Sequence, residues 1–330
     1  MSLDRYKGYI GLAIVLTILV VVAVVVSWNN YRNNYRDKFG AETPPKEQAK
    51  EQQNVVEPLM PPTENNTATG EEKNEGDLKE SEPVKTIKPD KDLEKYAPEL
   101  ATAKQLEAEK KLPEAKKAYE SLLSSFSNPA TLQKEIYRIN IAILFSPQQT
   151  APPDGPKTEV HTVVAKDTVE GIAKKYNTTV DLIKESNGIK DVRTIQIGNR
   201  FKVVNDEFSI IVSRSKNTLT LLAGDIVMKE YTVGTGEYDK TPIGDFKIRN
   251  KIPEPPWKGI PYGDPKNVLG TRWMGLINEG DTVPGYGIHG TWEPETVGKS
   301  VSQGCIRMVN EEVEELYKIV PVGTKVKIIE

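Results

Sequence analysis

Cysteine and histidine are almost missing from this chain. Its 330 residues hold one cysteine and two histidines, whereas a Cys/His zinc site needs three or four such ligands. That class of metal site is therefore nearly excluded. A lone cysteine cannot form a disulfide within the chain, and outside the cytoplasm an unpaired thiol is exposed to oxidation and usually avoided. Keeping one suggests that it is used, with a buried, inert cysteine as the alternative.

An excess of basic residues is also lacking. The chain carries 44 lysines and arginines against 47 aspartates and glutamates, a formal net charge of −3. Nucleic-acid-binding proteins normally carry a basic excess on one face, so we expect no nucleic-acid partner. A chain of this length has room for two or three domains.

One long hydrophobic run stands near the N-terminus. Residues 10–28 read IGLAIVLTILVVVAVVVSW, without a charge, which is just long enough to span a bilayer core of about 30 Å. We therefore expect a transmembrane anchor at 10–28, preceded by a cytoplasmic segment, 1–9. The alternative is a cleaved signal peptide, whose apolar core is usually about 7–15 residues long. Basic residues flank both ends of the run, so their count does not choose an orientation.

The next segments differ in composition. Residues 29–92 contain much Glu, Lys, Pro, Asn, Gln and Thr, and such a segment buries too little surface to fold, so we expect a disordered linker. Residues 93–146 show helical spacing, and the Ala/Tyr/Leu pattern around Glu114–Leu123 resembles one tetratricopeptide-type hairpin. This small α-helical unit would be a partner-binding module or a plain three-helix spacer. Residues 147–157 form a second linker.

Residues 158–205 have the pattern of a small βααβ module. Short strand patterns at His161–Val164 and Phe201–Val204 enclose two helical ones, and His161 is expected to be a strand residue without a catalytic role. This order resembles a LysM domain, which implies binding to glycans that contain N-acetylglucosamine, such as peptidoglycan. In that family the ligand contacts lie in the loops beside the helices. The candidate glycan-binding residues, which also serve as capping and turn residues, are Asp167, Thr168, Asn187 and Gly188.

Residues 207–330 read as a mainly-β domain with short helices. The chain's only cysteine, Cys305, follows one of its two histidines, His289, by 16 positions, and we expect both to lie in glycine-rich turns. A thiol with a pKa near 8.5 is mostly protonated at neutral pH. An imidazole that takes its proton gives a thiolate–imidazolium pair, a strong nucleophile for acyl transfer. The alternative is a cysteine of the core and an unrelated surface histidine.

The surrounding residues carry a resemblance. The stretches Gly287–Thr291 (GIHGT) and Ser302–Met308 (SQGCIRM) resemble the catalytic domain of the YkuD-type L,D-transpeptidases. The upstream stretches Val233–Gly236 and Thr241–Phe246 agree with it. Many members of the family have a second histidine where this chain has Gln303, so His289 is the sole candidate base in the domain.

The resemblance implies a cysteine acyltransferase that cross-links peptidoglycan without a cofactor or a metal. Cys305 would attack the carbonyl before the terminal D-alanine of a tetrapeptide stem, and His289 would deprotonate the thiol and then protonate the leaving amine. The amine of a diamino acid on a neighbouring stem would open the resulting thioester, giving a 3→3 cross-link. Arg307 would bind a substrate carboxylate or form a structural salt bridge. The supporting or oxyanion candidates are Gly304, Gly290, Ser302 and Arg307, and the substrate-groove candidates, with a core role as the alternative, are Trp273, Tyr286 and Trp292.

Together these segments predict a multidomain α+β chain: transmembrane helix, disordered linker, α-helical unit, LysM domain and mainly-β catalytic domain. The expected partners are peptidoglycan stem peptides and glycan strands, the membrane, and a protein bound by the helical unit. We expect a single-pass protein of the bacterial cytoplasmic membrane with its C-terminal bulk in the periplasm or the wall space. The same nucleophile and base would serve an L,D-carboxypeptidase or an enzyme that joins a protein lysine to the wall. A non-catalytic wall-binding scaffold is the alternative of another class.

Overall fold

The computed structural model describes residues 94–126, 128–147, 155–281 and 285–330. Within these ranges, no helix combines the length and the apolar character that crossing a membrane requires. The anchor expected at 10–28 and the linker expected at 29–92 lie outside the described residues.

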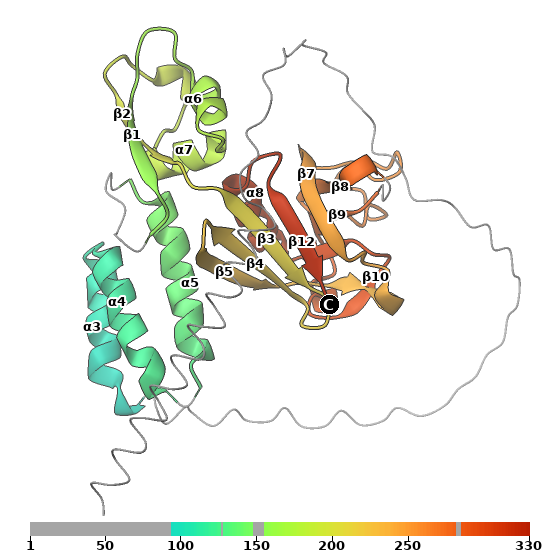
Figure 1. The fold of residues 1–330 in the computed structure, drawn as a ribbon, viewed down its shortest axis with the longest axis horizontal. Coiled ribbons are helices and arrows are strands. Elements are labelled where there is room, and N and C mark those ends of the chain that lie inside the picture. Colours follow the sequence, from blue (N-terminus) through green and yellow to red (C-terminus); the bar gives the residue numbers. More distant parts are fainter. Residues whose placement is uncertain (1–93, 127, 148–154, 282–284) are drawn as a thin grey trace, which may run out of the picture. The chain divides into compact units, whose positions relative to one another are not determined.

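Three helices begin the described part of the chain: α3 (Ala97–Ala108), α4 (Leu112–Leu122) and α5 (Ala130–Phe145), and they lie side by side in Figure 1. Both α3 and α4 carry a proline in the first turn, where the missing N–H would have no partner within the helix. The apolar residues of the three helices pack into one cluster around Ala103, Tyr119 and Ile139, as the helical spacing of the sequence predicts.

The other face of α5 packs against the catalytic domain. Ile141 and Leu144 belong to the hydrophobic core of its β-sheet. Asn140 is buried, and its side-chain amide donates to the backbone carbonyls of Val227 (3.2 Å) and Met228 (3.1 Å) on β5 (Ile226–Thr232). β5 is an edge strand, and an uncovered edge strand invites pairing with other chains. This face of α5 is therefore occupied from within the chain.

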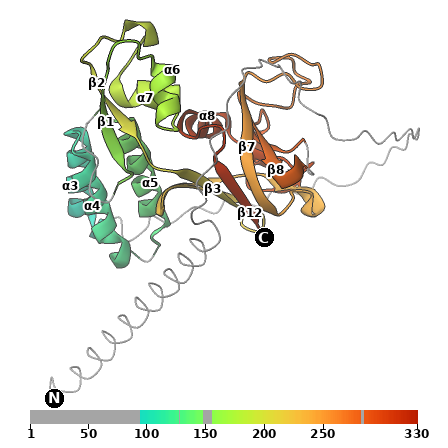
Figure 2. The ribbon, with the colours of Figure 1, turned by 45° about the horizontal axis from the view of Figure 1, so that its top comes forward.

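The next module has the predicted βααβ order, with β1 (Thr158–Thr162), α6 (Val169–Lys175), α7 (Val180–Asn187) and β2 (Arg200–Val204) (Figure 2). The strands β1 and β2 pair antiparallel. Lys202 on β2 is buried, and its ammonium donates to the carbonyls of Ile143 (2.7 Å) and Ser146 (2.8 Å) at the end of α5. The Ile143 carbonyl also accepts from the N–H of Ser146 (3.3 Å), the residue that caps α5. Burial lowers the pKa of Lys202 to about 8.

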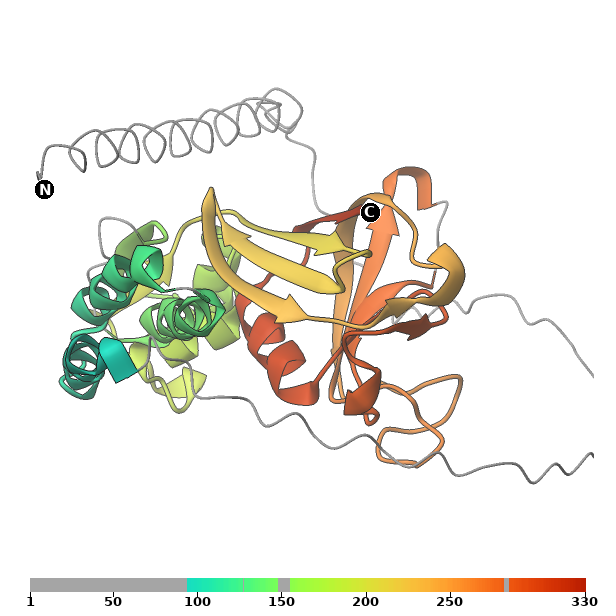
Figure 3. The ribbon, with the colours of Figure 1, turned by 90° about the horizontal axis from the view of Figure 1, so that it is seen from below.

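The catalytic domain is built on one eight-stranded mixed sheet, in the order β11-β9-β8-β7-β12-β3-β4-β5 (Figure 3). The helix α8 (Asn310–Ile319) contacts β8 and β9. Its buried residues, among them Val313 and Leu316, join the core of the sheet. The strands besides β5 are β3 (Phe208–Ser213), β4 (Thr218–Ala223), β7 (Gly244–Pro253), β8 (Arg272–Asn278), β9 (Gly287–Gly290), β11 (Ile306–Met308) and β12 (Lys325–Ile329), and a separate short pair joins β6 (Thr235–Gly236) to β10 (Ser300–Ser302).

The prediction that His289 lies in a glycine-rich turn is wrong. His289 is part of β9, which pairs with β8 on one side and with β11 on the other. The glycines of the GIHG stretch hide this strand from a propensity argument, because glycine is depleted in strands. Hydrogen bonding from both neighbours holds it in place. Cys305 does lie in a loop, between β10 and β11.

Candidate active site

The pairing of three strands places three side chains in one row. Trp273 on β8 lies opposite His289 on β9, and Arg307 on β11 lies opposite His289 on the other side. Directly opposite residues project from the same face of a sheet. The rings of Trp273 and His289 accordingly stack, with centroids 5.7 Å apart and planes at 23°. Trp273 is half-buried and supports the imidazole, and a further role in a substrate groove stays a prediction.

A single hydrogen bond fixes the orientation of His289. Its Nδ1 lies 2.6 Å from the carbonyl oxygen of Gly290. A carbonyl only accepts, so Nδ1 carries the proton and the lone pair is on Nε2. His289 is 4% exposed, and burial lowers the pKa of its imidazole to about 4. The Gly290 carbonyl opposes that shift and the charge of Arg307 adds to it. At neutral pH the imidazole is uncharged and can accept a proton at Nε2.

The sulfur of Cys305 lies against the residues that lead into β9. Its Sγ is 3.8 Å from the carbonyl oxygen of Gly285. Burial raises the pKa of the thiol to about 11, while the backbone N–H of Gly287 and the charge of Arg307 act to lower it. Both shifts favour a neutral thiol and a neutral imidazole at neutral pH, because burial disfavours both charges.

The loop that carries Cys305 is held by two hydroxyls. Ser302 is buried, and its Oγ donates to the Cys305 carbonyl (2.7 Å) and accepts from the Gly304 N–H (3.0 Å). The hydroxyl of Thr241 donates to the Gly304 carbonyl (2.9 Å). Because its N–H is bonded to Ser302, Gly304 does not supply the oxyanion donor expected of it, and the N–H of Cys305 is the remaining candidate.

Position 304 requires glycine for two reasons: its backbone conformation and the lack of space for a side chain. Its φ is +120°, a region that residues with a Cβ rarely adopt. A Cβ at this position would collide with the ring of Tyr286 and with the carbonyl oxygen of Lys240. Tyr286, a groove candidate, thus packs directly on the nucleophile loop.

Sequence reasoning missed the turn that supports this loop. Thr241 is fully buried and also accepts from the Gly236 N–H (2.7 Å), while Arg214 donates to the carbonyls of Asp239 (3.0 Å) and Thr241 (2.9 Å). Gln303, at the position of the family's second histidine, accepts a hydrogen bond from Lys240 (3.0 Å). The sequence around Thr241 resembles that of the family. Its contact with the loop of Cys305 could not be predicted, because the two segments are about 60 positions apart in the chain.

The remaining candidates divide between structural and exposed positions. Arg307 donates to the carboxylate of Glu293 (3.2 Å) and to the hydroxyl of Thr296 (3.4 Å), which is the structural alternative of its two predicted roles. Trp292 is 48% exposed, and its ring lies 5.9 Å from that of Tyr262. Trp292 is thus exposed, whereas Tyr262 is half-buried.

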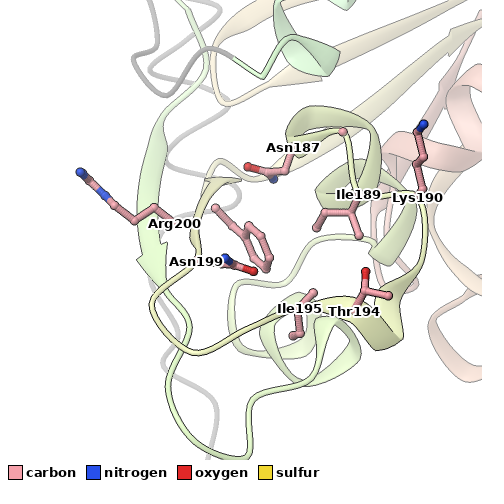
Figure 4. Close-up of a pocket in the computed structure, with 9 residues that line it drawn as sticks. Asn187, Ile189, Lys190, Thr194, Ile195, Asn199 and Arg200 are labelled. Carbon is pink, nitrogen blue, oxygen red and sulfur yellow. The ribbon is translucent and has the colours of Figure 1, made fainter.

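A cavity of about 450 Å³ lies in the βααβ module (Figure 4). Two of the four predicted glycan-binding residues, Asn187 and Gly188, line it. Asp167 and Thr168 do not. Asp167 accepts from His161 Nε2 (2.9 Å) and the Val164 N–H (2.8 Å), and Thr168 caps α6. The loop expected to contact the ligand, Asn187–Lys190, thus lines the cavity throughout. Sequence reasoning missed the rest of the lining, which comes from the segment that follows: Thr194, Ile195, Asn199, Arg200 and Phe201.

In the part of the chain that the structure describes, no three His, Cys, Asp or Glu side chains gather in the way that a metal site requires. The two reactive groups are a partly buried thiol, on the loop that enters β11, and an oriented imidazole on β9, the strand that pairs with β11.

Comparison with known proteins identifies the two domains in which these residues lie. The model of the L,D-transpeptidase catalytic domain, YkuD, matches residues 207–328, and the LysM model matches 161–204. YqjB of Bacillus subtilis, named for L,D-transpeptidase activity, is 44% identical over 122 residues, which is 36% of this chain and 69% of that protein. YkuD of the same organism is 35% identical over 168 residues, which is 49% of this chain and 93% of that protein.

Among solved structures, an L,D-transpeptidase from Mycobacterium smegmatis is similar with a TM-score of 0.32 and 21% identity. The match covers 41% of this chain and 65% of that chain.

The ionisation state of Cys305 can be measured directly, because it is the only cysteine in the chain. With a thiol pKa of about 11, the thiolate fraction rises about tenfold per pH unit below that value. We expect the rate of alkylation by iodoacetamide to keep rising from pH 7 to pH 10. Free cysteine in the same buffers provides the control and levels off above its pKa near 8.5. A plateau for Cys305 at or below pH 8 would contradict a neutral resting thiol.

Proposed function

The chain belongs to the YkuD family of L,D-transpeptidases, and we propose that Cys305 and His289 carry out its acyl transfer on peptidoglycan stem peptides. The observation that carries this proposal is the hydrogen bond from His289 Nδ1 to the Gly290 carbonyl. It leaves Nε2 as an unprotonated base in a site whose other reactive group is the chain's single thiol. A base and a nucleophile are the two groups that cysteine acyl transfer needs.

In the first half-reaction, Cys305 Sγ attacks the carbonyl carbon that precedes the terminal D-alanine of a tetrapeptide stem. His289 Nε2 takes the thiol proton as the S–C bond forms, and the Cys305 N–H faces the developing oxyanion. The imidazolium then protonates the D-alanine nitrogen. The C–N bond breaks, D-alanine leaves, and a thioester remains on Cys305.

The starting pair is neutral, so charge separates only when a substrate is being attacked. This protects the thiol between turnovers, because the thiolate is the form that oxidants attack. The guanidinium of Arg307 lies close enough to lower the pKa of Cys305, and its field favours the thiolate as the proton moves to His289.

In the second half-reaction, the side-chain amine of a diamino acid on a neighbouring stem attacks the thioester. His289 accepts a proton from this amine and returns one to the sulfur, so one amide has replaced another and a 3→3 cross-link results. Water in place of the amine would give an L,D-carboxypeptidase, and a protein lysine would give a ligase. Trp292, which is exposed, and Tyr262 beside it offer an aromatic surface for a bound stem.

We further propose that the LysM module holds the glycan strand in its cavity and that residues 10–28 anchor the chain in a membrane, with the catalytic domain on the wall side. The support is the 19-residue uncharged run and the position of Asn187 and Gly188 in the cavity. Holding the enzyme on its polymer raises the local substrate concentration. A protein partner of the helical unit would bind faces other than the one that α5 packs on the sheet.

The reaction is tested by mass spectrometry of products from purified disaccharide-tetrapeptide. We expect cross-linked dimers that have lost one D-alanine, no product with Cys305→Ala, and a loss of at least about a hundredfold with His289→Ala, since a positioned base typically contributes that much. Tripeptide monomers alone would move the assignment to carboxypeptidase. Cross-linking by Cys305→Ala at the native rate would remove the proposed nucleophile.

The cavity is tested by filling it. Thr194 lines it and is exposed, so Thr194→Trp should occupy space that the glycan needs. We expect this variant to sediment with insoluble peptidoglycan at least about tenfold less tightly, which corresponds to about 1.4 kcal/mol. The matched control is Lys174→Trp, which introduces the same ring on the exposed face of α6. Equal binding by both variants would place the glycan elsewhere.

A further inference from the structure

Asn310, the first residue of α8, lies between the two backbone segments that hold the catalytic base. Its Oδ1 accepts a hydrogen bond from the N–H of Thr271 (3.1 Å), just before β8. A Cβ added to either Gly270 or Gly290 would collide with this same oxygen. The amide of Asn310 therefore fills a gap between two chain segments that approach closely at a pair of glycines.

The same two segments meet at the carbonyl that orients His289. The N–H of Gly270 donates to the Gly290 carbonyl oxygen (2.9 Å), which also accepts from His289 Nδ1 (2.6 Å). The peptide group of Gly290 is thus fixed by the segment that Asn310 holds. Val313, on the first turn of α8, packs against the position of a Gly290 Cβ as well.

Asn310 also links the base to the nucleophile. It follows β11 (Ile306–Met308) by two residues and Cys305 by five, and β11 pairs with β9 in register, with Met308 opposite Gly290. The side chain of Asn310 therefore connects the segment after β11 to the segment before β8. That second segment holds the Gly290 carbonyl at the end of β9, the strand of His289.

We propose that Asn310 is a positioning residue for the reaction. Its side-chain oxygen holds the Gly270–Thr271 segment, this segment holds the Gly290 carbonyl, and that carbonyl keeps the proton of His289 on Nδ1. Without Asn310 the carbonyl gains freedom, and the imidazole populates the form with its proton on Nε2. That form cannot accept the thiol proton, so the chemical step slows while substrate binding is unaffected.

The experiment uses the full chain with ¹⁵N-labelled histidine. Only His161 and His289 contribute signals, and His161→Gln assigns them. We expect one tautomer for His289 in the unmodified chain, protonated at Nδ1, and a mixture of the two tautomers in Asn310→Ala. Asn310→Asp keeps an acceptor oxygen at the same place and should keep the single tautomer.

Two kinetic measurements accompany the spectra. We expect Asn310→Ala to lower kcat for cross-linking by about tenfold or more with KM within twofold, since small displacements of catalytic groups are costly. Alkylation of Cys305 by iodoacetamide at pH 10 should stay within twofold, because the thiolate formed there does not need the base. The control for lost stability is Asn140→Ala, which removes a buried asparagine with two hydrogen bonds far along the chain from the site.

A single Nδ1–H tautomer and an unchanged kcat in Asn310→Ala would overturn the proposal. An equal kcat loss in Asn140→Ala would also overturn it, since general destabilisation would then explain the effect. The kinetic comparison rests on the proposed function, whereas the tautomer does not. An unmodified chain without cross-linking activity would therefore refute the proposed function and leave the role of Asn310 to be decided by the spectra.

Discussion

The hydrogen bond between His289 Nδ1 and the carbonyl of its own neighbour, Gly290, is the interaction on which the catalytic site depends. Without it, neither tautomer of the buried imidazole would be favoured, and Nε2 would not be fixed as the atom that accepts a proton. The bond uses a backbone carbonyl where many catalytic histidines use a carboxylate. A carbonyl orients the ring without adding a negative charge, so it is compatible with a pair that stays neutral until a substrate arrives.

Burial sets the rest of the electrostatics. It lowers the pKa of His289 and raises that of Cys305, and both shifts move the pair away from the charged state. Arg307 is the nearby cation that acts on both groups, lowering the two pKa values. Its ion pair with Glu293 keeps it in place without bringing a substrate carboxylate into the reaction. Both shifts therefore favour the uncharged forms of the proposed catalytic pair.

The structure also shows why the loop of Cys305 needs support from distant parts of the chain. The loop has Gly304 at φ +120° and is not held by strand pairing. The hydroxyls of Ser302 and Thr241 hold it instead, by donating hydrogen bonds to its carbonyls. Polar side chains also support the contacts outside this domain. Lys202 closes the end of α5 and Asn140 covers the edge of the sheet, so the LysM module and the helical unit contact their neighbours through buried polar groups as well as apolar ones.

The sequence allowed a correct prediction wherever the signal was local. Helical spacing and the βααβ order of LysM both depend on residues close in the chain, whereas the pairing of Cys305 with His289 stays a prediction from the family motif. The strand around His289 was missed because glycines conceal it and its two neighbours define it. The N–H of Gly304 was assigned to the wrong partner because the acceptor, Ser302 Oγ, depends on loop geometry. Asn310 carries no catalytic signal at all, since its contacts at Gly270 and Gly290 exist only after folding.

The most direct test of the central claim is the intact mass of the protein after a short incubation with a tetrapeptide donor and no acceptor, followed by an acid quench. The account predicts an adduct whose mass equals the donor minus D-alanine, located on Cys305 by fragmentation and released by added amine. Turnover of the donor with no adduct, or with an adduct on another residue, would contradict the account.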